Sequence, residues 1–335
     1  MRNVNLLINE LSINSNARLY EKIILRPHMK PKRLREGDLI ALITPASAPA
    51  KQERIEAGIK YLTDRGFRTV VMPNAGKQRG YLAGTDAERV KDIHEAFGNQ
   101  DIKAIISMRG GYGAGRLLPY LDYDLAVRNP KIFTGYSDIT TLQMAILTQS
   151  SLVTFSGPMS AVDFAGELSD YTIGNYFKVV CEGWRGEVVP PSGEKMSGNG
   201  KGRASGVSAG GNLAVYCGIM GSRYLPSPEG KIFFFEDVSE PPYRIDRFLN
   251  NLRLAGYFEQ AAGFVFGKFT AGDPGDGPTL TQSEVFEDYI SMIEKPVVTN
   301  FPFGHIDDMF TLPFGIKVEI DSDSGSVYYA ESAVI

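Results

Sequence analysis

Short apolar runs and amphipathic segments alternate through the first half of the chain. Runs typical of buried strands occupy residues 39–44, 69–72, 104–108, 131–134 and 152–155. Between them, apolar residues recur three and four positions apart, as in Ile55, Ile59 and Leu62, and this spacing predicts helices. Strands that alternate with helices predict right-handed βαβ units around a mostly parallel sheet, which is an α/β fold.

The second half of the chain has a mixed pattern. Strand-like runs occupy residues 231–236, 263–269, 297–299 and 317–320, and helix-like segments occupy residues 171–181, 212–220, 243–255 and 283–293. Between the halves, residues 190–206 are rich in Pro, Gly and Ser and have no apolar period. That composition predicts a connector between domains or a long loop near the site.

Two glycine-rich turns follow predicted strands in the first half. Ligands of parallel sheets bind at the carboxyl ends of the strands, so the chemistry is expected in these turns, residues 109–115 and 135–138. The first turn does not satisfy the dinucleotide fingerprint G-x-G-x-x-G in any register; counted from Gly111, the third glycine position holds Arg116. Its exposed N–H groups could supply an oxyanion donor or hold a substrate carboxylate.

The second turn places a serine between a strand and a helix. In such an elbow a hydroxyl is held clear of the backbone, and the amide after the serine points at an oxyanion. Gly135 leaves room for a tight turn before Ser137, but the G-x-S-x-G pattern is incomplete because residue 139 is isoleucine. Alternatively, Ser137 or Asp138 only caps the following helix.

A serine nucleophile requires a base and an acidic partner. His305 is the candidate base because it lies in a loop after a predicted strand, where catalytic residues concentrate. Glu236 is the candidate carboxylate because it ends a strongly apolar strand, where an unpaired charge would be costly. Structural alternatives remain open: His305 could bond nearby backbone, and Glu236 could form an ion pair with Arg244 or Arg247.

The composition is that of an ordinary globular protein. The 335 residues, 43% hydrophobic and 22% charged, suffice for two domains. A net charge of −4 argues against a nucleic-acid footprint. The basic residues Lys30, Lys32, Arg33 and Arg35 are interpreted as a solvated lead-in, and residues 1–35 as an N-terminal extension.

Cysteines, histidines and apolar stretches indicate the compartment and bear on whether a metal site or a membrane helix is expected. Cys181 and Cys217 are expected to be buried free thiols, which indicates a reducing compartment. Three histidines without a Cys/His cluster predict no metal site, although His305 near Asp307 and Asp308 could bind a metal in principle. No stretch reaches the roughly 18 apolar residues of a membrane helix, and no signal-peptide pattern is present, so a cytoplasmic location without membrane association is expected.

A family resemblance extends from about residue 36 to residue 330. The chain resembles the serine LD-carboxypeptidases of murein recycling, peptidase family S66, which also include the microcin C immunity peptidases. The matching segments, in the family's order, are GDLIALITPAS, SMRGGYGAGRLLPYLDYD, PKIFTGYSDITTL, SAGGNL, KIFFFEDVSEPPYRIDRFLNNL and PFGHIDDMFTLPFG. The resemblance implies Ser137 as nucleophile, Glu236 as acid and His305 as base, with the backbone N–H groups of Gly111 and Asp138 as the oxyanion hole.

The resemblance also implies a domain plan. A Rossmann-like domain at residues 36–165 would carry the nucleophile. A connector would span residues 166–206, and a smaller β-rich domain at residues 207–335 would carry the glutamate and the histidine. The site would then lie at the interface between the two domains, so their relative position should affect the rate.

The implied activity is hydrolysis of the amide between an L-centre diamino acid and a terminal D-alanine in murein tetrapeptides, through an acyl-enzyme and without a cofactor. Arg109 is the candidate partner of the substrate carboxylate, and Asn212 is the candidate partner of the substrate backbone. The expected partner is this small peptide rather than nucleic acid or membrane. A homodimer is implied by the family alone.

Two other functions remain open. A microcin C-type immunity peptidase would cleave an aminoacyl-nucleotide amide, and Trp184, the only tryptophan, could stack on its base or simply pack in the core. A non-catalytic binder of cell-wall peptides would retain the fold, but the intact Ser, Glu and His argue against it. The sequence does not distinguish lysine from diaminopimelate before the D-alanine.

Overall fold

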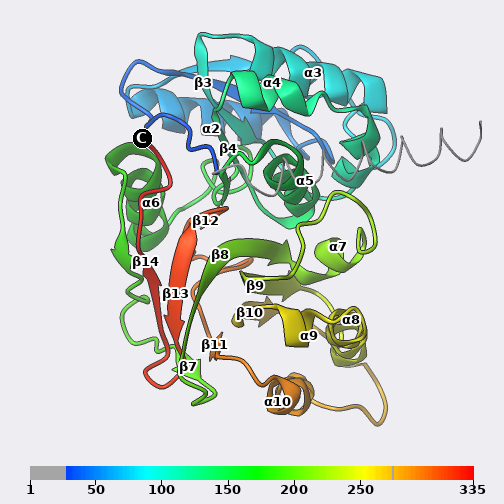
Figure 1. Cartoon of the computed structure of the whole chain (residues 1–335). Helices are drawn as coiled ribbons and strands as arrows, with labels where there is room; N and C mark the ends of the chain where they lie inside the picture. The colour runs from blue at the N-terminus through cyan, green and yellow to red at the C-terminus, as the bar shows by residue number, and fades with distance from the viewer. Residues whose placement is uncertain (1–27, 274) are drawn as a thin grey trace, which may run out of the picture.

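The computed structural model describes residues 28–273 and 275–335, which form two sheets with helices packed around them (Figure 1). The first sheet has six strands in the order β12-β5-β4-β3-β1-β2. These strands are β1 (Leu39–Ile43), β2 (Arg68–Val71), β3 (Ile102–Ser107), β4 (Ile132–Gly135), β5 (Thr154–Ser156) and β12 (Leu312–Phe314). All pairings among β1 to β5 are parallel, which confirms the α/β prediction.

Helices cover both faces of the first sheet. They are α2 (Gln52–Asp64), α3 (Asp86–Gly98), α4 (Tyr123–Arg128) and α5 (Thr140–Ser150), with the short 3-10 helices η1 (Ala114–Tyr120) and η2 (Ser137–Ile139). Alternate residues of β1 enter different cores, because successive side chains of a strand point to opposite faces. Ile40 and Leu42 belong to the core that includes Leu62 of α2, whereas Ala41 and Ile43 belong to the core that includes Ile93 of α3.

The second sheet is mixed and has eight strands in the order β6-β14-β13-β8-β9-β10-β11-β7. Its strands are β6 (Gly186–Glu187), β7 (Ser197–Gly198), β8 (Arg203–Asn212), β9 (Lys231–Val238), β10 (Gly263–Thr270), β11 (Val297–Thr299), β13 (Lys317–Asp321) and β14 (Ser326–Tyr329). The helices α7 (Leu213–Cys217), α8 (Pro242–Leu254), α9 (Tyr257–Gln260) and α10 (Gln282–Met292) also belong to this half of the chain. Strands β13 and β14 pair antiparallel and form a hairpin.

Strand β8 is a departure from the sequence prediction. A helix was expected over residues 212–220, but the chain remains extended to Asn212, and α7 has only five residues. Gly210 and Gly211 both have φ of 127°, and a Cβ atom on Gly210 would lie 2.0 Å from the carbonyl oxygen of Phe234 in β9. The strand therefore depends on close contact with a distant segment, which a local apolar pattern does not reveal.

Residues 166–206 contain regular structure. The helix predicted over 171–181 corresponds to α6 (Asp170–Phe177) and the π-helical turn η3 (Lys178–Glu182). The short strands β6 and β7 form the two edges of the second sheet. The segment thus contributes a helix, a π-helical turn and both edge strands of the second sheet.

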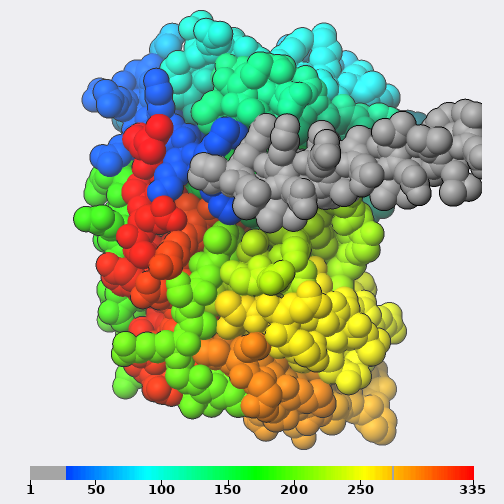
Figure 2. Space-filling view, in the orientation of Figure 1, coloured from blue at the N-terminus to red at the C-terminus, as the bar shows by residue number. Residues whose placement is uncertain are grey.

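The start of the described chain is attached to its end. Of the predicted N-terminal extension, residues 1–27 lie outside the described residues. Met29 donates its N–H to the carbonyl of Ser151, and the N–H of Ile335 donates to the carbonyl of Pro31. In Figure 2 the red carboxyl-terminal segment accordingly lies against blue residues near the start of the described chain.

Both cysteines are free thiols in the part of the chain that the structure describes, but Cys181 and Cys217 are partly rather than fully buried, which corrects the expectation. Burial raises the pKa of each thiol to about 12, so both are poor nucleophiles. Among the described residues, no helix has the length and apolar character needed to cross a membrane.

The close approach of β8 to β9 can be tested by substitution. Gly210→Ala should lower the free energy of unfolding by about 2 kcal/mol or more, because the new Cβ overlaps the Phe234 carbonyl and φ is positive. Gly174→Ala is the matched control, because Gly174 lies in α6 with open space around it, and alanine there should stabilise by up to about 1 kcal/mol. Urea unfolding of both variants measures the difference; equal stabilities would contradict the interpretation of β8.

Candidate active site

Ser137 stands at a sharp turn between β4 and the helices η2 and α5. Its φ is 63°, in the left-handed region that residues other than glycine rarely adopt, and such strain is typical of functional turns. A Cβ atom on Gly135 would lie 3.0 Å from a methyl group of Ile139, so the glycine leaves room for that isoleucine. Neither η2 nor α5 has a side-chain N-cap in the described structure, so the capping alternative for Ser137 and Asp138 is wrong.

The turn that follows β3 lies against Ser137. A Cβ atom on Gly110 would be 2.9 Å from the Cβ of Ser137 and 3.1 Å from its Oγ, so only a glycine lets the two turns approach this closely. Gly111 has φ of 104°. Within residues 28–273 and 275–335, the backbone N–H groups of Gly111 and Asp138 have no hydrogen-bond acceptor in the protein. Both amides are therefore available to a ligand oxygen.

His305 and Glu236 are brought together from separate parts of the second half. The Nδ1 atom of His305 lies 2.8 Å from Oε2 of Glu236, which is 1% exposed. Gly304 has φ of 133°, and a Cβ there would lie 3.1 Å from Glu236, so this glycine lets the loop reach the carboxylate. Arg244 pairs instead with Glu240 at 2.8 Å, so the alternative ion pair with Glu236 is not formed by this arginine.

Tyr136 connects the histidine to the serine turn. Its ring meets the imidazole of His305 edge to face, with 4.9 Å between centroids, and it immediately precedes Ser137. The Tyr136 hydroxyl donates to Oδ1 of Asp163 at 3.2 Å, and Oδ2 of Asp163 accepts the N–H of Met159 at 2.7 Å. The imidazole is thus held by Glu236 on one side and by an anchored aromatic ring on another.

Several carboxylates set the charge of the site. Burial lowers the pKa of His305, but the hydrogen bond and charge of Glu236, with Asp237 and Asp163, raise it more, so that the net pKa lies above 6.5. Burial raises the pKa of Asp237 to about 6, and the Glu236 charge adds to the rise. Burial also raises the pKa of Asp163. This acidic surrounding favours the imidazolium that forms when the histidine accepts a proton.

Asn212 is placed differently from the expectation. Its Nδ2 atom donates to Asp237 at 2.9 Å and to Glu236 at 3.2 Å, and its Oδ1 accepts the N–H of Val215 at 3.1 Å. The side chain is buried, and both ends of its carboxamide have protein partners. The structure therefore does not offer this carboxamide to a substrate backbone; it holds the acidic pair in place.

Arg109 lies at the start of the first glycine turn. Its side chain is partly buried, and Nη1 donates to the carbonyl of Ala48 at 2.9 Å. Among the described residues it forms no ion pair with a carboxylate, so its charge remains available to an anionic ligand.

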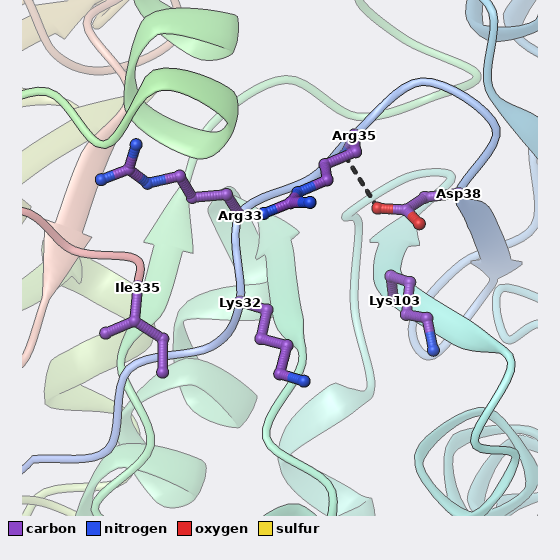
Figure 3. Close-up of a pocket in the computed structure, with 6 residues that line it drawn as sticks. All are labelled: Lys32, Arg33, Arg35, Asp38, Lys103 and Ile335. Carbon is purple, nitrogen blue, oxygen red and sulfur yellow. Dashed lines mark hydrogen bonds between the residues drawn. The ribbon is translucent and has the colours of Figure 1, made fainter.

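A cavity of about 450 Å³ elsewhere on the first sheet is separate from this site (Figure 3). It is lined by Lys32, Arg33, Arg35, Asp38, Lys103 and Ile335. Asp38 precedes β1 and Lys103 lies near the start of β3, so the cavity lies at the amino ends of these strands. Ser137, in contrast, follows the carboxyl end of β4. Its basic side chains point in different directions, and three of them are exposed residues of the predicted lead-in. Lys30 differs from that prediction, because it pairs with Glu331.

Sequence reasoning missed several residues around the site. Asp237 directly follows Glu236, and Tyr136 directly precedes Ser137, so adjacency to a candidate was the available signal for both. Asp163 acts through a contact with a distant segment, for which the sequence carries no local signal. Asn212 was a candidate, but its contact with Asp237 likewise has no local signal. In the described part of the chain, no group of three or more His, Cys, Asp or Glu side chains is arranged to hold a metal.

Known proteins and family models match most of this chain. The model of the LD-carboxypeptidase N-terminal domain matches residues 40–157, and that of the LD-carboxypeptidase C-terminal domain matches residues 205–320. The chain is 35% identical to a probable murein peptide carboxypeptidase of Bacillus subtilis, over 88% of this chain and 92% of the relative.

Solved structures are similar over most of the chain. MccF in complex with glutamyl sulfamoyl guanosine has a TM-score of 0.84 at 30% identity and covers 91% of this chain and 99% of its own. A muramoyltetrapeptide carboxypeptidase from Oxalobacter formigenes has a TM-score of 0.75 at 31% identity and covers 87% of this chain and 97% of its own.

The hydrogen bond from Glu236 should control the titration of His305. In Glu236→Gln the pKa of His305 should fall, because the hydrogen bond and charge that offset burial are removed. Asp237→Asn is the matched control and should lower it less. NMR titration of the imidazole measures both; an unchanged pKa in Glu236→Gln would contradict this account.

The same shift links His305 to stability. Its folded pKa lies above the unfolded value of 6.5, so the protonated histidine stabilises the fold below about pH 6.5, and this contribution is lost as pH rises through the folded pKa. Glu236→Gln should remove that pH dependence. Urea unfolding of wild type and variant at pH 6 and pH 9 tests it; a wild-type pH dependence in the variant would contradict the linkage.

Proposed function

The chain belongs to the LD-carboxypeptidase family and is a serine-type carboxypeptidase, and from that premise we propose that it removes the terminal D-alanine from murein tetrapeptides in cell-wall recycling. The bond cleaved would join the L-centre of a diamino acid to D-alanine. The observation that carries the proposal is the hydrogen bond between His305 and buried Glu236, beside a turn that presents Ser137 in a strained conformation.

In the proposed reaction Ser137 is the nucleophile. Nδ1 of His305 faces Glu236, which favours the tautomer with a proton on Nδ1 and leaves Nε2 to take the proton of the serine hydroxyl. The serine oxygen attacks the amide carbonyl carbon, and His305 then gives its proton to the departing amine of D-alanine. Water, deprotonated by His305, releases the acyl group from Ser137.

The oxyanion that forms during attack would be stabilised by the backbone N–H groups of Gly111 and Asp138. Both lack a protein acceptor in the described structure, and Gly110 brings the two turns together. Donors aimed at the developing charge are worth about 10²–10³ in turnover for each hydrogen bond. The guanidinium of Arg109 would bind the free carboxylate of the terminal residue.

A microcin C-type activity is the second candidate, because a solved neighbour with a TM-score of 0.84 holds glutamyl sulfamoyl guanosine. Trp184 is the residue that could either stack on a nucleobase or pack in the core. Its ring lies edge to face on Phe310 at 5.4 Å and tilted against Tyr329 at 6.0 Å, with Lys178 at 5.4 Å over the ring. These contacts favour the packing interpretation and therefore the murein substrate.

Three further predictions derive from the sequence and the family resemblance. They are a homodimer, a cytoplasmic location, and domain boundaries at residues 36, 166 and 207. Light scattering of the purified protein would test the dimer.

Replacing the nucleophile should abolish turnover without unfolding the protein. Ser137→Ala should lower kcat by about 10⁴-fold or more, because it removes the attacking oxygen. Ser151→Ala is the matched control, since Ser151 also has a left-handed φ of 59° but lies at the end of α5. Mass spectrometry of murein tetrapeptide should show loss of one alanine with wild type and the control only.

Other outcomes of that experiment discriminate between the functions. Turnover by Ser137→Ala would sink the assignment of the nucleophile. If folded wild type releases no alanine but cleaves an aminoacyl sulfamoyl nucleoside, the second candidate replaces the first. If it cleaves neither and does not react with a fluorophosphonate probe, the non-catalytic binder remains.

The role of Arg109 can be tested with substrates that have or lack a free terminal carboxylate. Arg109→Ala should raise KM for the tetrapeptide by about 10- to 100-fold, the value of a charge-assisted hydrogen bond, with a smaller effect on kcat. For a substrate that ends in D-alaninamide, wild type and variant should have similar KM, because the anion is absent. An equal loss on both substrates would show that Arg109 does not bind the carboxylate.

A further inference from the structure

Arg89 of α3 is an arginine buried in the protein interior, only 2% exposed. Its Nη1 atom donates to the carbonyl of Pro45 at 2.6 Å and to the carbonyl of Gly113 at 3.0 Å, and Nη2 pairs with Asp86 at 2.5 Å. A buried cation is costly unless its donors are satisfied, and two of its acceptors are main-chain carbonyls. These carbonyls belong to the turns that follow β1 and β3, so one side chain ties two active-site loops together.

The side chain of Asp138 connects a third loop, the one after β4, to the loop after β3. Its carboxylate is 6% exposed, and Oδ2 accepts the N–H of Ala114 at 2.7 Å. Asp138 lies after β4, whereas Ala114 lies after β3. The residue whose amide is a proposed oxyanion donor therefore also holds, through its side chain, the loop that carries the other donor.

The glycine turn between these two side chains has little freedom. Ser47 donates its N–H to the carbonyl of Gly110 at 3.1 Å, and the N–H of Tyr112 donates to the hydroxyl of Ser47 at 3.2 Å. Gly113 has φ of 115°, and a Cβ there would lie 2.3 Å from Leu82 and 3.1 Å from Nη1 of Arg89. The peptide groups around Gly111 are thus committed to protein partners, while its own N–H is left for a ligand.

We propose that Arg89 and Asp138 act as a clamp that sets the position of the Gly111 amide relative to the Asp138 amide, and thereby the geometry of the oxyanion hole. The inference rests on the proposed function, since it takes both amides as oxyanion donors. Both side chains are positioning residues that act through the turn. Misplacement of a reacting group by about 1 Å can cost 10²-fold in rate, so loss of either contact should appear mainly in kcat.

The charges around the clamp determine how it responds to pH. Burial raises the pKa of Asp138 to about 6, against the opposing effects of the Ala114 and Gly113 amides and the charge of Arg89. Beyond Arg89 lies Asp86, which also pairs with Arg116 at 2.9 Å. The other titrating groups of the site are His305, Glu236, Asp237 and Asp163. Protonation of Asp138 would weaken its bond to the Ala114 amide, so the clamp should loosen below about pH 6.

Two variants and one matched control test the clamp on the intact protein. Asp138→Ala removes the acceptor of the Ala114 amide. Arg89→Met removes the donors to Pro45 and Gly113 but keeps a long, unbranched side chain. Each should lower kcat for murein tetrapeptide by about 10- to 100-fold and leave KM within about threefold. Arg116→Met breaks a contact of the same Asp86 from the exposed side and should retain wild-type kcat.

A second readout separates positioning from a merely structural role. Asp138→Asn keeps a neutral acceptor but cannot titrate. Between pH 7 and pH 5 its log kcat/KM should fall less steeply than that of wild type, because the titration of Asp138 no longer adds to that of His305. Affinity for a peptide phosphonate that mimics the tetrahedral intermediate should fall in Asp138→Ala by the same factor as kcat/KM, with product affinity unchanged.

The outcomes distinguish this inference from the function on which it rests. If Ser137→Ala is inactive while folded Asp138→Ala retains kcat within twofold, or Asp138→Asn keeps the wild-type acid slope, the clamp is overturned and the proposed function stands. If wild type releases no alanine, the proposed function fails first. If Arg89→Met does not fold, Asp138→Ala and Asp138→Asn decide the question alone.

Discussion

Strand β12 carries three residues from the carboxyl-terminal half of the chain to the edge of the first sheet, where it pairs antiparallel with β5. All three residues are buried, and the pairing sets Leu312 opposite Ser156 and Phe314 opposite Thr154. The loop that holds His305 lies directly before β12, so this pairing determines where the imidazole stands relative to the turn after β4. A slip of one residue would turn the buried side chains to the other face, so the register is strongly specified.

The burial of charged groups is the second constraint. It holds the active site in one arrangement but is weak evidence for a higher free energy of unfolding. Glu236 is 1% exposed, yet it has partners in His305 and Asn212. Removing one partner of such a buried pair costs about 3–5 kcal/mol, because the other group is left uncompensated. Asp163 and Asp138 follow the same rule, since each is held by backbone N–H groups. The residues that tune the histidine are therefore also those that hold its surroundings in one arrangement.

Much of the first half was predictable because its signals are local. The apolar runs of β1 to β4, the glycine turns and the serine after β4 follow from neighbouring residues, and the structure has them where the pattern placed them. Strand β8 was not predicted, since its glycines carry no apolar period and its conformation is set by contact with β9. Strand β12 was also absent from the predicted strands, because it is short, contains proline and becomes a strand only beside β5.

The chemical groups could be predicted from the sequence: an elbow-like serine, an acid at the end of an apolar strand, a loop histidine, and glycines that let backbones approach closely. The tertiary structure was needed to establish that His305 and Glu236, 69 positions apart, form a hydrogen bond. It also decided that Asn212 supports the acid, and that Arg89 and Asp138 hold the glycine turn from two sides. The physical reason is that strand and turn preferences depend on neighbours in the chain, whereas the partner of a buried charge depends on which distant segments fold against it.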